Sequence, residues 1–541
     1  MSKIITYDKE AREKLVKGVD AVASTVSKTL GPKGRNVVVG KQYGSPAIIN
    51  DGVSIAKEIE LKDPLENAGV RLLQEVSSKT NDAAGDGTTT ASVLAQAIIH
   101  EGLKALENGA NPIQMKDGIH DAVDNVVKFI ERQAVEVDER RLEQVATVSA
   151  GNNPEIGKLI ADAIKQVGDD GVVTVEESQT MGTSLKTAEG IQLEHGYLSP
   201  YFITDQERQE CVLERPFILL VSKKINLITD ITPIMEQAAR EGRSVLLVAE
   251  DVEGEALAFL VVNAMRKVLK CAAVKAPGFG DNRKNNLIDL GVITGATVWT
   301  EELGLELSKI NLGFMGNATR VTLKKDETTI VVDDKTKEQI AEHVRILKAQ
   351  LEQEDDDYRK EKLQERIARL AGGVAVIQVG AASEVELKER KLRVEDALNA
   401  TKAAKAEGIV AGGGYTLLQA QIYENSKDME AGHSDYNAGY NILVNALSLP
   451  IKQIAQNAGV DGDEVIKQCI EKKLGYNALT GVYEDLLEAG VVDPAKVTKS
   501  ALINAASIAG MLLTTEAAIV EEPITAENGG FAPAGGAPMM M

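Results

Sequence analysis

Apolar positions recur with helical spacing over most of the first 132 residues. Residues 9–30 place a stripe of Leu, Val and Ala opposite Lys, Arg, Glu and Asp, which predicts an amphipathic helix. Gly31 ends this pattern, and the apolar runs Val37–Val39 and Ala47–Ile49 predict a short hairpin. Helical spacing then resumes and continues to about residue 132. The first region is therefore predicted to be mainly helical.

The pattern changes in the middle of the chain. A shorter, mixed pattern at 134–188 predicts a connecting module, and strand-like runs then alternate with helical ones between about 189 and 374, which predicts an α/β domain. The runs are Phe217–Val221, Val245–Ala249, Cys271–Lys275 and Thr297–Thr300. Helical spacing returns at 383–406.

Two glycine clusters precede helical segments more than three hundred residues apart. The first is Gly85-Asp86-Gly87-Thr88-Thr89-Thr90, and the second is Ala411-Gly412-Gly413-Gly414. Each glycine run permits a tight turn at a helix start, where unpaired N–H groups favour an anion. If both clusters bind one ligand, the residues between them form an insertion.

The first cluster also carries an acid among hydroxyl groups. A single carboxylate is a suitable Mg²⁺ ligand where phosphate oxygens and water complete the coordination, so Asp86 could hold a metal against a phosphate. Asp-Gly is also a common turn and Thr a common helix cap. These six residues alone leave both interpretations open.

Composition limits the classes of protein. The chain has 541 residues, 44% hydrophobic and 26% charged, with a net charge of −21, which opposes binding to nucleic acid or to anionic membrane surfaces. The three cysteines, Cys211, Cys271 and Cys469, suit structural thiols in a reducing compartment better than disulfides or a zinc site. The chain starts without an apolar leader, and it has no apolar run long enough to span a bilayer. We therefore expect a cytoplasmic protein of several domains that binds neither nucleic acid nor membrane.

Seven apolar residues follow one another at Ala256–Val262, inside a segment of helical spacing. Such a helix is apolar on every side and is most simply a core helix. It could instead form an exposed apolar groove with Ile231, Ile234 and Met235, and with the aromatic residues at 197, 201 and 202.

Six long motifs, in order, resemble one family over essentially the whole chain. They are Leu30–Asn36 (LGPKGRN), Gly85–Thr90 (GDGTTT), Gly196–Phe202 (GYLSPYF), Lys275–Gly280 (KAPGFG), Arg393–Leu398 (RVEDAL) and the Gly412 cluster. Together they resemble the group I chaperonins, the bacterial GroEL type of 60 kDa chaperonin.

The resemblance implies a multidomain fold with α and α/β parts, in three domains. A mainly helical equatorial domain that binds ATP would comprise 1–132 and 407–541, with a disordered tail from about 521. A small α+β intermediate domain would comprise 133–188 and 375–406, and an inserted α/β apical domain 189–374 would bind polypeptides. The resemblance also implies a homo-oligomer of two stacked rings of seven subunits.

The resemblance further implies a nucleotide site with ATP and Mg²⁺ as cofactors and with room for K⁺. The residues that match nucleotide-binding positions are Thr29, Leu30, Gly31, Pro32, Asp86, Gly87, Thr88, Thr89, Thr90, Gly413, Asn477 and Asp493. Asp86 would be the metal ligand. Asp396 would be the catalytic acid that orients or deprotonates the attacking water, although on sequence alone it is one acid on a charged helix.

The family match also implies a surface that binds non-native polypeptides and then a GroES-type co-chaperonin. Its residues here would be Tyr197, Tyr201, Phe202, Met235, Leu257, Val261 and Val262. The expected function is that of an ATP-driven chaperonin ATPase that captures and encloses non-native chains. A ring-forming paralogue that binds ATP but only scaffolds or holds proteins is the alternative. A metabolic kinase is less well supported, because the sequence has no Walker pattern or catalytic dyad.

The chain departs from the family pattern at several positions. Asn50 stands where a Lys is common, Leu479 where a second small residue is usual, Thr232 in place of a typical Leu, and His195 in place of an Arg. That Arg can pair with an acid of a neighbouring subunit, and the corresponding acid here would be Glu384. The tail ends Pro538-Met539-Met540-Met541 rather than in repeats of Gly-Gly-Met.

Overall fold

The computed structural model describes residues 3–40, 46–168, 172–178, 182–206, 208–333, 336–354, 356–427 and 434–522. The chain divides into two compact units. The first combines Met1–Ala161 with Ala381–Met541, and the second is the continuous segment Asp162–Gly380. The sequence from about 521 onward was predicted to be disordered, and beyond residue 522 this tail lies outside the described residues.

The first unit is built mainly from helices. They are α1 (Asp8–Val26), α2 (Gly52–Lys57), α3 (Pro64–Ala84), α4 (Thr88–Glu107), α5 (Pro112–Gln133), α6 (Glu139–Ser149), α13 (Glu384–Glu407), α14 (Tyr415–Asn425), α15 (Ser434–Ala446), α16 (Leu449–Asn457), α17 (Gly462–Lys472) and α18 (Ala495–Leu513), with a 3-10 turn η1 (Ser27–Thr29). Helix α7 (Pro154–Val167) begins in this unit and ends in the second.

Among its described residues, the first unit also has four two-stranded sheets. They pair β1 (Lys3–Tyr7) with β18 (Ala517–Glu521), β2 (Val37–Val39) with β3 (Ala47–Ile49), β14 (Ile409–Ala411) with β17 (Val492–Pro494), and β15 (Gly475–Asn477) with β16 (Val482–Glu484). The predicted hairpin is confirmed, because Val38 lies opposite Ile48 in the antiparallel pair of β2 and β3.

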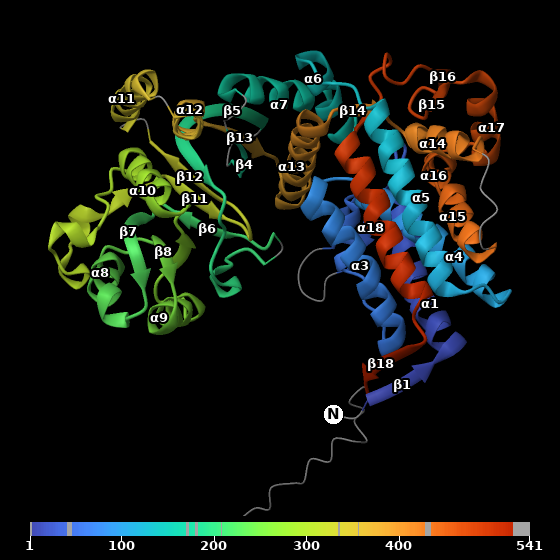
Figure 1. The fold of residues 1–541 in the computed structure, drawn as a ribbon, viewed down its shortest axis with the longest axis horizontal. Coiled ribbons are helices and arrows are strands. Elements are labelled where there is room, and N and C mark those ends of the chain that lie inside the picture. Colours follow the sequence, from blue (N-terminus) through green and yellow to red (C-terminus); the bar gives the residue numbers. More distant parts are fainter. Residues whose placement is uncertain are drawn as a thin grey trace, which may run out of the picture. The chain divides into compact units, whose positions relative to one another are not determined.

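Long helices from both ends of the chain share one core. Helix α1 packs on α3, α4 on α18, and α5 on α15 (Figure 1). The predicted stripe of α1 is confirmed, since Val19 and Val22 are fully buried in the same apolar cluster as Ile98 of α4 and Ala505 of α18. The helical prediction for the first region therefore holds, and the core can form only when the C-terminal segment joins it.

The second unit mixes strands and helices. Its strands are β4 (Val172–Glu177), β5 (Gly182–Leu193), β6 (Cys211–Glu214), β7 (Phe217–Ile225), β8 (Val245–Val252), β9 (Cys271–Lys275), β10 (Gly316–Asn317), β11 (Arg320–Leu323), β12 (Thr328–Val332) and β13 (Val374–Gly380). Its helices are α8 (Ile228–Arg240), α9 (Gly254–Met265), α10 (Gly280–Thr294), α11 (Lys337–Gln353) and α12 (Asp357–Gly372), with 3-10 turns η2 (Pro200–Phe202), η3 (Glu301–Leu303), η4 (Leu307–Lys309) and η5 (Leu312–Phe314).

A four-stranded sheet in the order β10-β7-β8-β9 forms the centre of the second unit. Strands β7, β8 and β9 are parallel, and their residues are almost continuously buried, as expected where helices cover both faces. Three of the four predicted strands are confirmed. The prediction of a strand at Thr297–Thr300 is wrong, because there only Trp299 forms an isolated bridge, to Val221 of β7.

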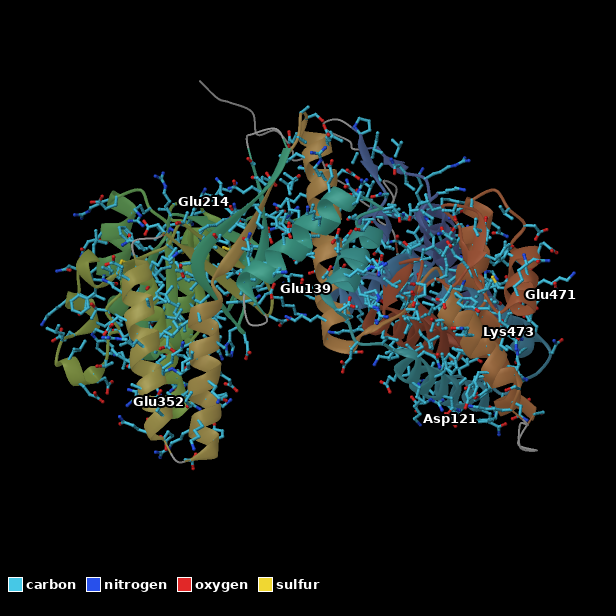
Figure 2. The ribbon with its side chains drawn as sticks, turned by 90° about the horizontal axis from the view of Figure 1, so that it is seen from above. Asp121, Glu139, Glu214, Glu352, Glu471 and Lys473 are labelled. Carbon is cyan, nitrogen blue, oxygen red and sulfur yellow. The ribbon has the colours of Figure 1, made fainter. Side chains whose placement is uncertain are left out.

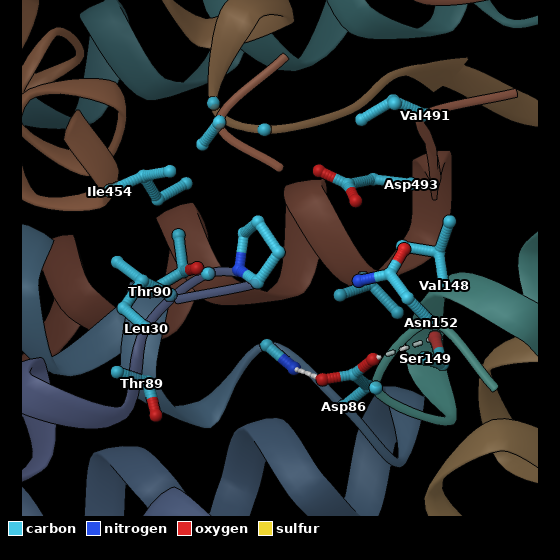
Figure 3. A pocket seen from close by; sticks show the side chains of 18 of the residues that line it. Leu30, Asp86, Thr89, Thr90, Val148, Ser149, Asn152, Ile454, Val491 and Asp493 are labelled. Atoms are coloured by element: carbon cyan, nitrogen blue, oxygen red, sulfur yellow. Dashed lines mark hydrogen bonds between the residues drawn. The ribbon is translucent and has the colours of Figure 1, made fainter. Parts of the chain in front are cut away.

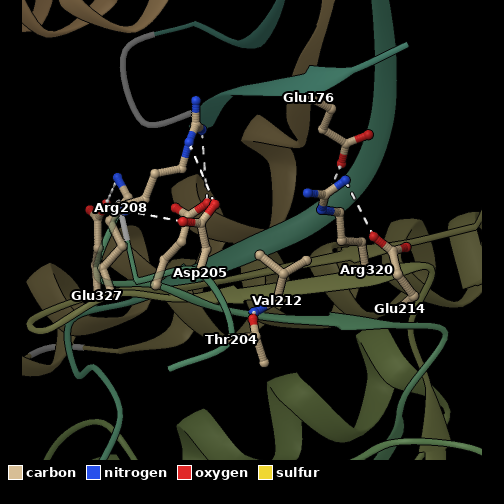
Figure 4. Close-up of polar contacts among 10 residues, drawn as sticks. Glu176, Thr204, Asp205, Arg208, Val212, Glu214, Arg320 and Glu327 are labelled. Carbon is tan, nitrogen blue, oxygen red and sulfur yellow. Dashed lines mark hydrogen bonds and ion pairs between the residues drawn. The ribbon is translucent and has the colours of Figure 1, made fainter. Parts of the chain in front are cut away.

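A second, curled sheet has the order β4-β13-β5-β12-β11-β6. Arg320 of β11 pairs with Glu214 of the neighbouring strand β6 at 3.4 Å. It also reaches Glu176 of β4 at 3.6 Å, although β4 and β11 lie four places apart in the sheet (Figure 4). Such a contact requires strong twist, which the long strand β5 provides by belonging to both halves of the sheet.

Charged side chains lie on the outside of both units. Asp121, Glu139 and Glu471 of the first unit are exposed, as are Glu214 and Glu352 of the second (Figure 2). The negative charge of the chain is therefore spread over hydrated surfaces, where most acids cost little free energy. The acids that lie in a pocket are few, and they mark the candidate site.

Candidate functional site

The first glycine cluster forms a tight loop between α3 and α4. Gly85 ends α3 with a φ of 70°, and Gly87 precedes α4 with a φ of 82°. Both angles lie in the left-handed region that glycine adopts without strain. The three threonines form the first turn of the 20-residue helix α4, whose leading N–H groups have no partner within the helix. This helix start can therefore bind an anion.

Two glycines also allow neighbouring elements to approach this loop closely. A Cβ atom on Gly85 would lie 2.2 Å from Cβ of Asn399 in α13, and one on Gly52 would lie 2.3 Å from Oγ1 of Thr89. Helices α13 and α2 thus pack directly on the loop. Because Asp396 precedes Asn399 by one helical turn, this packing brings Asp396 to the pocket that the loop lines.

The loop opens onto a cavity of about 800 Å³, within the range of ligand-binding pockets. All residues predicted for the nucleotide site line it, together with the predicted catalytic acid. These are Thr29, Leu30, Gly31, Pro32, Asp86, Gly87, Thr88, Thr89, Thr90, Asp396, Gly413, Asn477 and Asp493. Figure 3 shows Leu30 and Ile454 on one side of the pocket and Ser149, Asn152 and Asp493 on the other. The structure thus assembles residues separated by more than four hundred positions.

The segment 29–32 is held in place by α16. Nδ2 of Asn457 donates to the carbonyl oxygens of Ser27 at 2.8 Å and Leu30 at 2.9 Å. Gly31, with a φ of 86°, turns the chain against Ile454, whose Cγ2 atom would lie 3.0 Å from a Cβ at that position. These contacts fix the backbone of one wall before any ligand binds.

Among the described residues that line the pocket, acids outnumber cations: they are Asp51, Asp86, Glu143, Asp396 and Asp493 against Arg140 and Arg393. Burial, and then the charges of Asp51 and Asp86, raise the pKa of Asp396 well above its usual value. Burial and the charge of Asp86 raise the pKa of Asp493 to about 7, although the Gly413 N–H group opposes this shift. The pKa of Asp86 is also raised by burial. A pocket with this charge pattern favours a cation.

Asp86 has the contacts expected of an oriented metal ligand. One carboxylate oxygen accepts from the Gly87 N–H group at 2.5 Å, and the other accepts from the Ser149 hydroxyl at 3.2 Å (Figure 3). Within the described residues no group of three or more His, Cys, Asp or Glu side chains could hold a metal by itself. Asp86 therefore suits Mg²⁺ only when a ligand such as phosphate supplies further oxygens.

Sequence reasoning missed three residues of this pocket. Asp51 caps α2 by accepting from the N–H groups of Val53 and Ser54, and its charge raises the pKa of Asp396. Ser149 orients Asp86, and Asn152 lines the pocket with a φ of 61°, a conformation that Asn adopts more readily than most residues. The local signals were two turn-forming runs, Asn50-Asp51-Gly52 and the Gly and Asn residues at 151–153 before Pro154.

The second unit carries apolar side chains on α9 and η2. Tyr201 is 63% exposed and Val262 is 43% exposed, whereas Tyr197, Leu257 and Val261 are partly buried. These five residues of the predicted polypeptide-binding set reach the surface.

The expectation that Phe202 and Met235 face solvent is wrong. Each is only 2% exposed and packs in the core of the second unit, as do Ile231 and Ile234 of α8. The helical spacing of α8 places Ile231, Ile234 and Met235 on its buried face, in the same apolar cluster as residues of the central sheet. The exposed apolar surface is consequently narrower than predicted and lies mainly on α9 and η2.

The four departures from the family pattern differ in their surroundings. Asn50 and Leu479 both line the pocket. The Thr232 hydroxyl donates to the Ile228 carbonyl within α8 at 2.8 Å. His195 is partly buried, and its Nδ1 atom has no hydrogen-bond partner in the described part of the chain, while Glu384 pairs with Lys388 at 3.6 Å. The contact of His195 with Glu384 of a neighbouring subunit stays a prediction.

The three cysteines and the apolar character of the helices can be examined directly. Cys211, Cys271 and Cys469 are buried and free, and burial raises the pKa of Cys211 and Cys271 to about 12, so that both are inert thiols. Among the described helices, none combines the length and apolar character needed to cross a bilayer.

The family of the chain follows from a comparison with models of known families. A model of the TCP-1/cpn60 chaperonin family matches residues 22–523. Because the match spans most of the chain, this chain belongs to the TCP-1/cpn60 chaperonin family. The predicted fold class is confirmed, whereas membership of group I stays a prediction.

One solved structure illustrates the shared fold. The chain is similar to the chaperonin gp146 from the bacteriophage EL 2 (Pseudomonas aeruginosa), whose crystals were studied in the presence of ATP-BeFx. The TM-score is 0.68 with 22% sequence identity, over 96% of this chain and 100% of that chain. At this level of identity the similarity establishes the fold alone.

Proposed function

We propose that this chain is an ATP-dependent chaperone of the group I type, which captures non-native polypeptides and encloses them for folding. The observation that carries the proposal is the pocket in which the start of α4, Asp86 and Asp396 converge. A helix start for phosphates, a carboxylate for a metal and a second carboxylate for water are the parts that phosphoryl transfer requires.

In this proposal each side chain has a separate task. The N–H groups of Thr88, Thr89 and Thr90 and the dipole of α4 bind phosphate oxygens. Asp86, oriented by Gly87 and Ser149, would hold Mg²⁺, which supplies charge neutralisation when bound. K⁺ is a further cation that the family resemblance allows. Asn50 contributes no cation where the family often has a Lys, so neutralisation depends more heavily on bound metal.

Asp396 is proposed to act on water. Its carboxylate accepts a proton from a water molecule whose oxygen attacks the γ-phosphorus of ATP, while the bond from that phosphorus to the bridging oxygen breaks and ADP leaves. The charges of Asp51 and Asp86 raise the pKa of Asp396 in the free pocket. Neutralising Asp86 removes part of that repulsion and favours the carboxylate form that can accept the proton.

The second part of the proposal concerns Tyr197, Tyr201, Leu257, Val261 and Val262 of the second unit. Non-native chains share exposed apolar surface and little else, so an apolar surface suits them better than a shaped pocket. We propose that a GroES-type co-chaperonin binds the same surface, that subunits assemble into two stacked rings of seven, and that the protein acts in the cytoplasm. The three predicted domains, 1–132 with 407–541, 133–188 with 375–406, and 189–374, belong to this proposal.

Refolding of a denatured enzyme tests the proposal. The full chain with Mg-ATP and a GroES-type partner should restore activity, and omission of ATP, of Mg²⁺ or of the partner should abolish the gain. ATP hydrolysis without any refolding would favour the scaffolding or holding paralogue. Absence of both ATP binding and client capture would refute the proposal.

A further inference from the structure

The motif Arg393–Leu398 places an arginine one helical turn before the acid that is proposed to act on water. Arg393 and Asp396 lie three residues apart in α13, so they share one face of the helix, and both line the pocket of the first unit. Asp396 has a task in the proposed function, whereas Arg393 has none. A permanently basic side chain on this wall of the pocket therefore needs an explanation.

Cationic side chains are scarce in this pocket. Among the described residues that line it, only Arg140 and Arg393 are cationic. Arg140 is exposed in the first turn of α6, whereas the side chain of Arg393 is 33% exposed. Because water screens an exposed charge, the less hydrated guanidinium of Arg393 interacts more strongly with an anion in the pocket.

The guanidinium of Arg393 lies against Gly151. A Cβ atom at Gly151 would lie 3.8 Å from Nε and 3.9 Å from Cζ of Arg393. Gly151 follows Ser149 by two residues, and the Ser149 hydroxyl donates to Asp86 at 3.2 Å (Figure 3). The guanidinium therefore lies on the same wall of the pocket as the hydroxyl that orients Asp86, the side chain proposed to hold Mg²⁺.

Arg393 has an N–H group that the protein does not use. Its Nη2 atom donates to Glu389 one turn earlier in α13. Its Nε–H group is buried and has no hydrogen-bond partner in the described part of the chain. A guanidinium carries five N–H donors in a planar fork that matches the oxygens of a phosphate, and a buried donor without a partner is unfavourable. A phosphate oxygen in the pocket would supply that partner.

The ion pair with Glu389 does not prevent Arg393 from binding a ligand. The side chains of the pair are 33% and 29% exposed, so water partly screens the attraction between them. A terminal phosphate carries more negative charge than one carboxylate and offers several acceptor oxygens. Exchange of Glu389 for a phosphate is therefore favourable when a triphosphate occupies the pocket.

We propose that Arg393 binds the terminal phosphate of ATP and stabilises the negative charge that develops on its oxygens during hydrolysis. The inference rests on the proposed function and adds a second residue of α13 to the reaction. Phosphoryl transfer spreads negative charge over the equatorial oxygens of the transferred group, and an arginine from the same chain can neutralise that charge. The guanidinium acts without any proton transfer.

Calorimetric titration of the assembled full-length protein with Mg-ADP and with a non-hydrolysable Mg-ATP analogue isolates the contact with the terminal phosphate. Arg393→Gln removes the charge and should weaken binding of the ATP analogue by about tenfold or more, with the affinity for ADP changed by less than about threefold. Arg393→Lys should recover part of the loss, because it restores the charge without the planar fork.

Arg390→Gln is the matched control. Arg390 pairs with Glu386 four residues earlier in α13, as Arg393 does with Glu389, but Arg390 is not among the residues that line the pocket. This variant should leave both affinities unchanged. Arg140→Gln removes the other cation of the pocket and should not alter the ratio of the two affinities.

Hydrolysis tests the role of Arg393 in the transition state. At saturating ATP, Arg393→Gln should lower kcat by about 10²-fold or more, whereas Arg390→Gln should retain the wild-type value. The inference is overturned if Arg393→Gln weakens binding of ADP and of the ATP analogue equally, if it changes neither affinity, or if only Arg140→Gln shows the selective loss. Should Arg393→Gln fail to fold, Arg393→Lys decides, since its partial loss should affect the ATP analogue alone.

Failure of the proposed ATPase would give a different result. If wild type binds the ATP analogue but hydrolyses no ATP, the titrations alone decide. A selective loss of affinity for the ATP analogue in Arg393→Gln then supports the phosphate contact without the ATPase. Binding of neither nucleotide by wild type would overturn both proposals.

Discussion

The pocket of the first unit and the apolar surface of the second unit differ in how closely the structure brings together the residues predicted for each. Each predicted residue of the pocket lines one cavity, although Thr29 and Asp493 lie at opposite ends of the sequence. On the apolar surface, Tyr201 and Val262 are exposed as expected, but Phe202 and Met235 are buried.

The difference arises from the kind of signal that each residue carries. Glycines that need a positive φ or a close approach are bound to particular backbone positions, so Gly85 and Gly87 fix their loop locally. An apolar side chain contributes free energy by losing contact with water, whichever surface covers it. The sequence therefore cannot distinguish a side chain covered by its own sheet from one that awaits a partner.

The largest expected effect in the pocket is on catalysis. Asp396→Asn should lower kcat for ATP by about 10²- to 10⁴-fold, because the variant cannot accept the proton of the attacking water. Nucleotide affinity, measured by equilibrium titration, should change little. Asp82→Asn, an exposed acid on α3 outside the pocket, is the matched control and should retain wild-type kcat. A large loss of affinity in Asp396→Asn would contradict the assigned role.

The largest expected effect in the second unit is on stability. Phe202→Ala removes a core side chain and should lower the free energy of unfolding of that unit by about 3 to 5 kcal/mol. Chemical denaturation followed by the fluorescence of Trp299, the single tryptophan of the chain, measures this unit. A loss below about 0.5 kcal/mol would mean that Phe202 is not a core residue and would restore it to the binding surface.

The adjacent residue should behave in the opposite way. Tyr201→Glu should leave the fluorescence transition nearly unchanged but reduce capture of a denatured client by at least about tenfold, because it places a charge on the apolar surface. Val262→Ser should act in the same direction. Leu303→Ser serves as a control at similar exposure outside the predicted surface. If all three variants lost client capture equally, the effect would be nonspecific. The predicted surface would then not differ from its surroundings in client binding.

The acids of the pocket should make the stability of the first unit depend on pH. Because the pKa of Asp493 is raised to about 7, the folded chain holds a proton between about pH 4 and 7 that the unfolded chain releases. This contribution to stability is present at low pH and is lost as pH rises through 7. As pH rises from 5 to 8, the calorimetric Tm of the nucleotide-free wild type should fall relative to the Tm of Asp493→Asn. Parallel curves would contradict the raised pKa.

The smallest effect is expected at Thr232. The Thr232 hydroxyl donates its hydrogen bond to the Ile228 carbonyl within α8. Thr232→Leu therefore leaves no backbone group without a hydrogen-bond partner, and it adds apolar area beside the predicted surface. Client affinity should rise by a few fold, which corresponds to less than about 1 kcal/mol. Competition between labelled and unlabelled denatured client measures the change. An unchanged or weaker affinity would indicate that α8 lies outside the binding surface.

Hydrophobic periodicity predicted most of the elements because their amphipathic stripes are long. The stripe of α1 and the apolar runs of β7, β8 and β9 are examples. Hydrophobic periodicity failed at Thr297–Thr300, because four residues are too few to specify strand pairing. It also could not predict the curled sheet in which Arg320 pairs with Glu176. Asn477 shows a similar limit at the site, because family resemblance implies its place in the pocket but not its bonds to Glu484 and the turn.

The insertion of the second unit has a consequence for how the chain folds during synthesis. Strand β1 pairs with β18, and α4 packs on α18, so the first unit cannot complete its core until the last helix has been made. The intervening Asp162–Gly380, roughly 220 residues, takes about 10 to 45 s to translate at about 5 to 20 residues per second. The second unit is continuous and can fold during that interval. The N-terminal helices meanwhile expose the stripe that α18 later covers, so a newly made chain is itself an aggregation-prone species for much of its synthesis.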